Sequence, residues 1–162
     1  MSKFLISFVI TTALVTGWAG PSYSENFTQV EKFFALRNAI TEHGNAIPEQ
    51  IKNSTGSDLR TLERIFEMET STLTTIEAYF RILMIAVSTK SETDPGTVKI
   101  LNGWLDFISN QCKYDIEYLE EASKETDNPV VLEEIIVTKN NTEKLADIVK
   151  KSIAENSAML EQ

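Results

Sequence analysis

Three charged residues, Arg37, Glu69 and Asp115, occupy positions that the spacing of their apolar neighbours assigns to the buried side of a helix. Counting back from the predicted helix ends brings all three to about the same level of an antiparallel bundle. A buried charge without a partner is costly, and two adjacent carboxylates raise the pKa of one of them. Because the fork of an arginine can satisfy both carboxylates, the spacing predicts a buried polar layer formed by these three residues.

Two other interpretations of this layer stay open. Small rotations of the helices would move each charged head to the rim of the bundle, where its stem packs and its charge stays in water. Alternatively, Glu69 and Asp115 would form a ligand or metal site. Di-metal bundles, however, use a Glu-x-x-His pair on each of two helices, and the chain has one histidine, His43, without such a pair. We therefore predict no catalytic metal.

Other common reaction sites are not matched either. The sequence contains no Cys-x-x-Cys-His haem motif, no Gly-x-Ser-x-Gly nucleophile motif and no Gly-rich phosphate loop. His43 comes directly before Gly44, which indicates a helix end where the imidazole interacts with the last carbonyls. Cys112 is the only cysteine and lies on an apolar stripe, so we expect a buried, inert thiol. These observations predict a protein without catalytic residues and without a cofactor.

Four long helices would have to position these residues. Gly56, the pair Pro95-Gly96, and Pro129 mark three breaks, and between the breaks apolar residues recur every three or four positions. The expected helices cover residues 26–53 and 58–88, with a third that begins near 95 and a fourth that begins behind 129. Helices of about 30 residues joined by short loops pack as antiparallel neighbours, so the sequence predicts an all-α, up-down-up-down four-helix bundle.

Two places interrupt the helical pattern. Gly44-Asn45 and Pro48 predict a kink, or a stop and restart, in the first helix. Asn102-Gly103 lies inside the third helix and is also a dipeptide that forms tight turns. We expect irregular backbone geometry at these two places.

A second apolar stripe runs beside the predicted core stripe on the second and third helices. Its candidate partner-binding residues are Ile82, Ile85, Ile100, Trp104, Phe107 and Tyr114. One interpretation is a wide apolar face that simply completes the core. The other is an open groove for a protein partner, a ligand or a second copy in a homodimer, because contiguous exposed apolar patches usually mark interaction sites.

Residues 1–24 have the pattern of an export signal. Lys3 precedes an apolar run of about a dozen residues, short of the roughly 20 that span a bilayer, and Ser22 and Ser24 have the spacing that a signal peptidase accepts. We expect a signal peptide over 1–24, a four-helix domain over 25–162, and a periplasmic or secreted location without a stable membrane anchor.

The net charge of −9 at pH 7 argues against a nucleic-acid partner.

The sequence thus predicts an exported, soluble, acidic bundle that binds an unidentified protein partner, or a second copy of itself, and catalyses no reaction. A membrane-tethered, sensor-like bundle with a retained leader is one alternative. A metal-carboxylate enzyme or carrier that uses Glu69 and Asp115 is the other, and it belongs to a different functional class.

We expect cleavage after Ser24, which leaves Glu25 at the mature N-terminus, because small residues precede that bond at the required spacing. The intact mass of the protein purified from its native compartment measures the cleavage site. A membrane-associated species that retains residues 1–24 would contradict cleavage and favour the tethered alternative.

Overall fold

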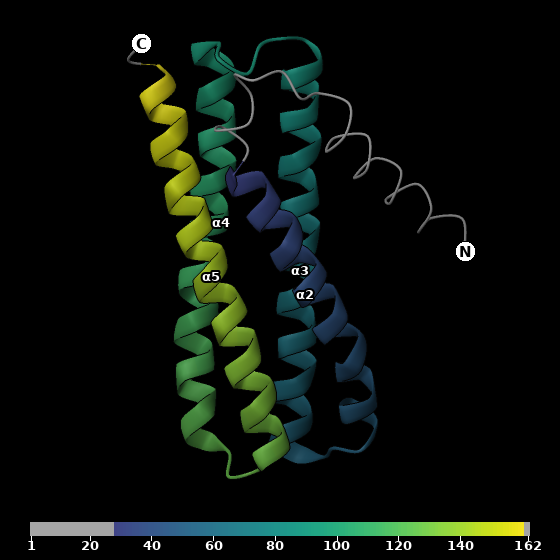
Figure 1. Ribbon diagram of the computed structural model, residues 1–162. Helices are drawn as coiled ribbons and strands as arrows, with labels where there is room; N and C mark the ends of the chain where they lie inside the picture. Colours follow the sequence, from purple (N-terminus) through teal and green to yellow (C-terminus); the bar gives the residue numbers. More distant parts are fainter. Residues whose placement is uncertain (1–27, 161–162) are drawn as a thin grey trace, which may run out of the picture.

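Residues 28–160 are described by the computed structural model, and they form four α-helices and no strand. The helices are α2 (Thr28–Lys52), α3 (Gly56–Ser88), α4 (Pro95–Glu125) and α5 (Pro129–Met159). Successive helices run in opposite directions along the long axis (Figure 1). The prediction of an all-α, four-helix fold is confirmed for these residues, whereas the predicted signal peptide over residues 1–24 lies outside them.

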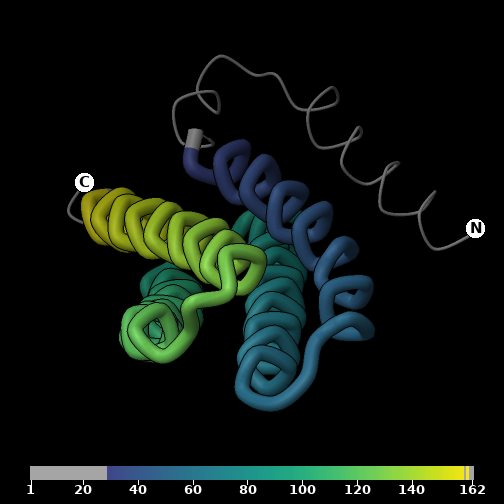
Figure 2. The backbone as a smooth tube through the Cα atoms, turned by 90° about the horizontal axis from the view of Figure 1, so that it is seen from below, coloured from purple at the N-terminus to yellow at the C-terminus, as the bar shows by residue number. Residues whose placement is uncertain are grey.

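The end-on view places α2 and α4 at opposite corners of the bundle (Figure 2). α2 packs against α3 and α5, and α4 packs against the same two helices. α3 and α5 also contact each other and so cross the centre of the arrangement. An inward-facing side chain in the middle of α2 therefore has its neighbours on α3 and α5.

α4 and α5 begin with the same combination of a polar cap and a proline. Pro95 is the first residue of α4, and the carboxylate of Asp94 accepts a hydrogen bond from the backbone N–H of Thr97. Pro129 begins α5 behind Asn128, whose side-chain oxygen accepts a backbone N–H of the first turn. The cap satisfies a donor that the helix leaves free, and the proline has a φ that suits the first turn. These starts lie where the sequence predicts them.

α2 continues through the segment where a kink, or a stop and restart, was expected. Gly44 and Pro48 both lie inside the helix, although Pro48 cannot donate the usual hydrogen bond to the carbonyl four residues earlier. Ile47 is fully buried, and Ile51, one turn later, packs against the same apolar cluster. Burial of these side chains outweighs the lost hydrogen bond. α4 likewise passes through Gly103 without a turn.

The apolar core consists of two clusters arranged along the bundle axis. The first cluster, towards the α3–α4 loop, contains Phe33, Leu36, Ile40, Ile76, Tyr79, Leu101, Leu105, Ile108, Cys112, Leu145, Ile148 and Val149. The second cluster, towards the other two loops, contains Ile47, Leu62, Ile65, Met68, Leu119, Ala122, Val131 and Ile135. Each cluster takes side chains from all four helices.

Over residues 28–160, no helix is both long enough and apolar enough to cross a membrane.

Hydrogen bonds close the end of the bundle beside the second cluster. Asp58, in the first turn of α3, accepts hydrogen bonds from the hydroxyl of Thr126 at 2.9 Å and from the side-chain amide of Asn128 at 2.7 Å. Thr126 and Asn128 belong to the loop that joins α4 to α5. A single carboxylate thus joins the start of α3 to the start of α5.

Replacing Asp58 by Ala should lower the free energy of unfolding by about 1–3 kcal/mol, because two hydrogen bonds to a charged acceptor are lost. Urea melts of the two proteins measure the difference. Glu63→Ala is the matched control on the same helix, since Glu63 is exposed, and it should change stability by less than about 0.5 kcal/mol. Equal effects of the two substitutions would show that the Asp58 contacts add nothing measurable.

Candidate functional site

A layer of polar side chains separates the two apolar clusters. Each helix contributes to it: His43 from α2, Glu69 from α3, Asp115 from α4 and Thr138 from α5. Glu69 is 4% exposed and Asp115 is 7% exposed, so both carboxylates lie in the interior. These two residues were expected in a buried layer, but His43 takes the place that the sequence analysis assigned to Arg37.

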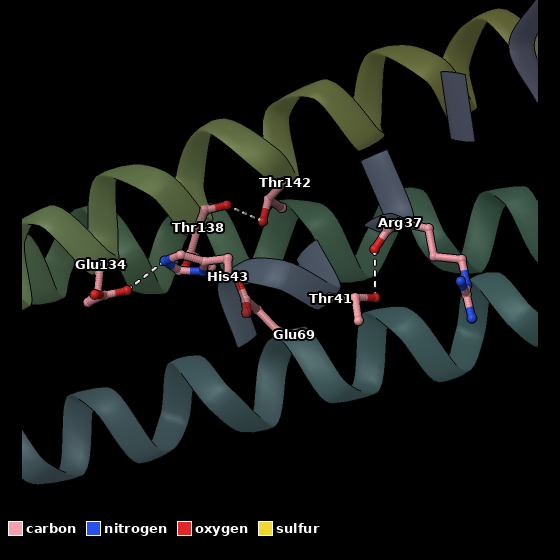
Figure 3. Close-up of polar contacts among 7 residues, drawn as sticks. All are labelled: Arg37, Thr41, His43, Glu69, Glu134, Thr138 and Thr142. Carbon is pink, nitrogen blue, oxygen red and sulfur yellow. Dashed lines mark hydrogen bonds and ion pairs between the residues drawn. The ribbon is translucent and has the colours of Figure 1, made fainter. Parts of the chain in front are cut away.

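The ring of His43 lies between two carboxylates that belong to different helices (Figure 3). Its Nδ1 is hydrogen-bonded to Oε1 of Glu69 on α3 at 2.6 Å, and its Nε2 lies 2.5 Å from Oε2 of Glu134 on α5. The second contact is an ion pair whose angles are not those of a hydrogen bond. The hydroxyl of Thr138 also donates to Oε1 of Glu69, at 3.3 Å. His43, Glu69 and Glu134 are called the His43 cluster below.

The His43 cluster favours the protonated imidazole. The hydrogen bond with Glu69 raises the pKa of His43 above its ordinary value of 6.5, and burial of the ring opposes this in part. The negative charges of Glu69 and Glu134 raise the pKa further. A protonated ring presents a donor to each carboxylate, which a neutral ring cannot do. The cluster therefore holds a proton in the middle of the bundle.

Gly44 permits the close approach of the Glu69 carboxylate to α2. A Cβ atom at Gly44 would lie only 3.0 Å from Oε2 of Glu69, which is tighter than ordinary van der Waals contact. A larger residue would therefore displace the carboxylate that binds His43. The prediction that His43-Gly44 forms a helix end is wrong: the pair lies inside α2, where the glycine makes room for a side chain of α3.

A small cavity with both apolar and polar lining residues adjoins the His43 cluster. Its volume is about 10 Å³, and its lining includes Glu69, Thr72, Asp115, Thr138 and Asn141. This is about the space that one water molecule needs. Burial raises the pKa of Asp115 above its ordinary value of 3.8, and the positive charge of Arg64 opposes this in part. Between residues 28 and 160, no group of three or more His, Cys, Asp or Glu side chains is arranged to hold a metal ion.

Arg37 lies away from the polar layer. Its guanidinium forms an ion pair with Glu77, with 2.7 Å between Nη2 and Oε1, near the surface of the α2–α3 seam. Figure 3 shows the Arg37 side chain nearer the N-terminus of α2 than His43 and directed away from the His43 ring. The expected contact of Arg37 with Glu69 and Asp115 is therefore not formed.

The prediction for Arg37 is wrong because the sequence of α2 fits two alternations of three-residue and four-residue steps. From Phe33, a step of four and then of three leads through Arg37 to Ile40, whereas the reverse order leads through Leu36. The structure follows the reverse order, since Leu36 is buried in the first cluster. The next step of three from Ile40 then brings His43 inward. The sequence of α2 therefore fits two equally regular patterns, and the second of them predicts that His43 faces inward.

Cys112 is buried in the first cluster, as expected. Burial raises the pKa of its thiol to about 12, because the interior does not solvate a thiolate. The only cysteine of the chain is therefore a neutral thiol at physiological pH and a poor nucleophile.

The six residues expected to bind a partner divide into exposed and half-buried side chains. Those of Ile85, Ile100, Phe107 and Tyr114 are 64%, 57%, 56% and 70% exposed. Ile82 and Trp104 pack against the first cluster, and Trp104 meets Phe107 edge-on with 6.2 Å between ring centroids. These six residues (Ile82, Ile85, Ile100, Trp104, Phe107 and Tyr114) are called the α3–α4 apolar surface below.

An imidazole between carboxylates has the groups that acid–base chemistry requires. The adjoining cavity, however, has room for about one water molecule and none for an organic substrate. What the arrangement can do is bind and release a proton inside the core, which links the stability of the fold to pH.

Replacing His43 by Ala should lower the free energy of unfolding by about 3 kcal/mol or more at pH 6, because two buried carboxylates lose the cation that lies between them. Arg37→Ala is the comparison on the same helix, and its loss should stay below about 1 kcal/mol, as is usual for an ion pair near the surface. Urea melts of both variants measure these losses. A larger effect of Arg37→Ala than of His43→Ala would contradict the placement of the two side chains.

The chain was compared with protein-family models, with curated proteins and with solved structures. None of the three comparisons found a match.

Proposed function

We propose that this protein is an exported helical bundle that acts by binding another protein, and not by catalysis, through the α3–α4 apolar surface. The observation on which this rests is the exposure of four large apolar side chains: Ile85, Ile100, Phe107 and Tyr114 are each more than half exposed. Single exposed apolar residues are common on soluble proteins, but a contiguous group usually marks an interaction site.

The chemistry of this surface suits protein recognition. Trp104 is anchored against the first cluster and contacts Phe107, which is itself exposed. Large aromatic side chains that are held in place by their own protein lose little conformational freedom on binding, and they are frequent among residues that dominate interface energetics. Ile82 packs against the same cluster and supports the surface from α3.

The spacing on α4 favours a helical partner. Ile100, Phe107 and Tyr114 lie seven residues apart, and Trp104 lies four residues after the first of them. A seven-residue repeat of apolar side chains is the pattern along which two helices pack side by side. α4 already buries its other stripe in the bundle core, so this second stripe is available to a helix of a partner protein or of a second copy.

Export is the second part of the proposal, and it is supported by the leader-like pattern of residues 1–24. If the leader is retained, the same surface would belong to a membrane-tethered, sensor-like bundle. The metal-carboxylate alternative has less support, because Glu69 is engaged by His43 and shares with Asp115 a cavity of about 10 Å³.

Truncation of Phe107 to Ala should weaken self-association or partner capture while lowering the free energy of unfolding by less than about 1 kcal/mol, since the ring is largely exposed. Leu105→Ala is the matched control two residues away: it is fully buried, and it should cost about 2–5 kcal/mol. Sedimentation measures self-association, capture from the native compartment measures partner binding, and urea melts measure stability.

The two substitutions separate a binding surface from a core face. If Phe107→Ala destabilises the protein as much as Leu105→Ala, and the wild type is monomeric and captures no partner, the side chain belongs to the core and the proposed binding function is wrong. Loss of binding without loss of stability supports it.

A further inference from the structure

His43 connects α2 to both helices against which α2 packs. Glu69 lies on α3 and Glu134 lies on α5, and each places a carboxylate oxygen within 2.6 Å of a different nitrogen of the ring. On either side of this level α2 is attached by apolar side chains, namely Phe33, Leu36 and Ile40 in the first cluster and Ile47 in the second. Nearer its N-terminus it also has two polar contacts, Gln29 with Glu155 on α5 and Arg37 with Glu77 on α3. The His43 cluster is thus the polar attachment at the centre of α2.

We propose that the His43 cluster makes the attachment of α2 pH-dependent: the protonated imidazole holds α2 to α3 and α5, and its deprotonation loosens the middle of α2 from the other three helices. The inference concerns the interior of the bundle and does not depend on the proposed binding function of the α3–α4 apolar surface.

The contacts of the neighbouring groups explain why the deprotonated state is unfavourable. Glu69 and Glu134 are both buried, so a neutral imidazole would leave two carboxylates in the interior without a cation. Two cations on the same helices as the cluster are engaged elsewhere, because Lys139 on α5 pairs with Glu120 at the surface and Arg37 on α2 pairs with Glu77.

The helix α4 contributes a further carboxylate to this region. Asp115 on α4 lines the small cavity together with Glu69. The positive charge of Arg64 on α3 partly opposes the rise in the pKa of Asp115. The remaining partner of Glu69 is the hydroxyl of Thr138, which donates one hydrogen bond and cannot neutralise the charge. The charged groups that act on His43 itself are the carboxylates of Glu69 and Glu134, and water must enter to solvate them once His43 is neutral.

The direction of the pH effect follows from the sign of the shift. The folded state raises the pKa of His43 above the ordinary 6.5, so the stabilisation is fully present below 6.5 and is lost as the pH rises through the folded-state value. Burial also raises the pKa of Asp115, from 3.8, which gives an effect of the same sign at lower pH. Measurements from pH 6 upwards therefore report mainly the contribution of His43 to the pH dependence of stability.

The first experiment is an NMR titration of the full chain made without a histidine tag. Because the chain contains a single histidine, its imidazole signal belongs to His43 without assignment by mutation. The expected midpoint lies above 6.5 in the wild type and moves down in Glu134→Gln, whose carboxamide keeps the shape but not the charge. Glu120→Gln, which removes an ion pair at the surface, should leave the midpoint unchanged. A wild-type midpoint at or below 6.5 would overturn the proposal.

The second experiment is hydrogen exchange followed by mass spectrometry across the same pH range, with rates corrected for the intrinsic effect of pH. In the wild type, exchange in the middle of α2 should rise several-fold through the His43 midpoint, while the α4 segment around Leu119 changes less. In His43→Gln, which is neutral throughout, α2 should exchange fast at pH 6 and show no such rise. Parallel changes in α2 and α4, or none in α2, would overturn the proposal, and both can be read from the wild type alone if a variant fails to fold.

Discussion

The bundle encloses three carboxylates, those of Glu69, Asp115 and Glu134, in an interior that offers them little water. Two of them are compensated by one imidazolium, and burial favours the protonated form of the third. The arrangement in the middle of the molecule follows from this requirement. His43 has to face inward, and the residue after it has to be small enough for a carboxylate to approach the backbone of α2.

The polar layer also separates two apolar clusters that adjoin different features of the molecule. The first cluster lies beneath Ile82 and Trp104, so it supports the α3–α4 apolar surface. The second cluster is closed by the hydrogen bonds of Asp58. His43 lies on α2, which stands opposite α4 (Figure 2). The α4 part of the surface proposed for binding therefore lies on a helix that does not contact the helix of His43.

Sequence patterns predicted the helices well where their periodicity had one solution. On α4 the residues that recur every three or four positions from Val98 to Ala122, the core stripe that the helical period predicts, coincide with the buried residues and include Asp115. On α2 two step orders were equally regular, and only packing in the first cluster decided between Leu36 and Arg37. Glu134 was missed because it stands beside Ile135, an ordinary core residue. Its pairing with His43 joins segments far apart in the chain, and local periodicity holds no information about such contacts.

One consequence of the layer concerns the register of the helices. A shift of α2 by seven residues would keep its apolar stripe facing the core, so hydrophobic burial alone opposes such a slip only weakly. The same shift would put Leu36 or Gln50 at the level of His43 and leave Glu69 and Glu134 without a cation. Either seven-residue shift thus loses charge compensation at the centre, and one imidazole opposes such a slip of a 25-residue helix.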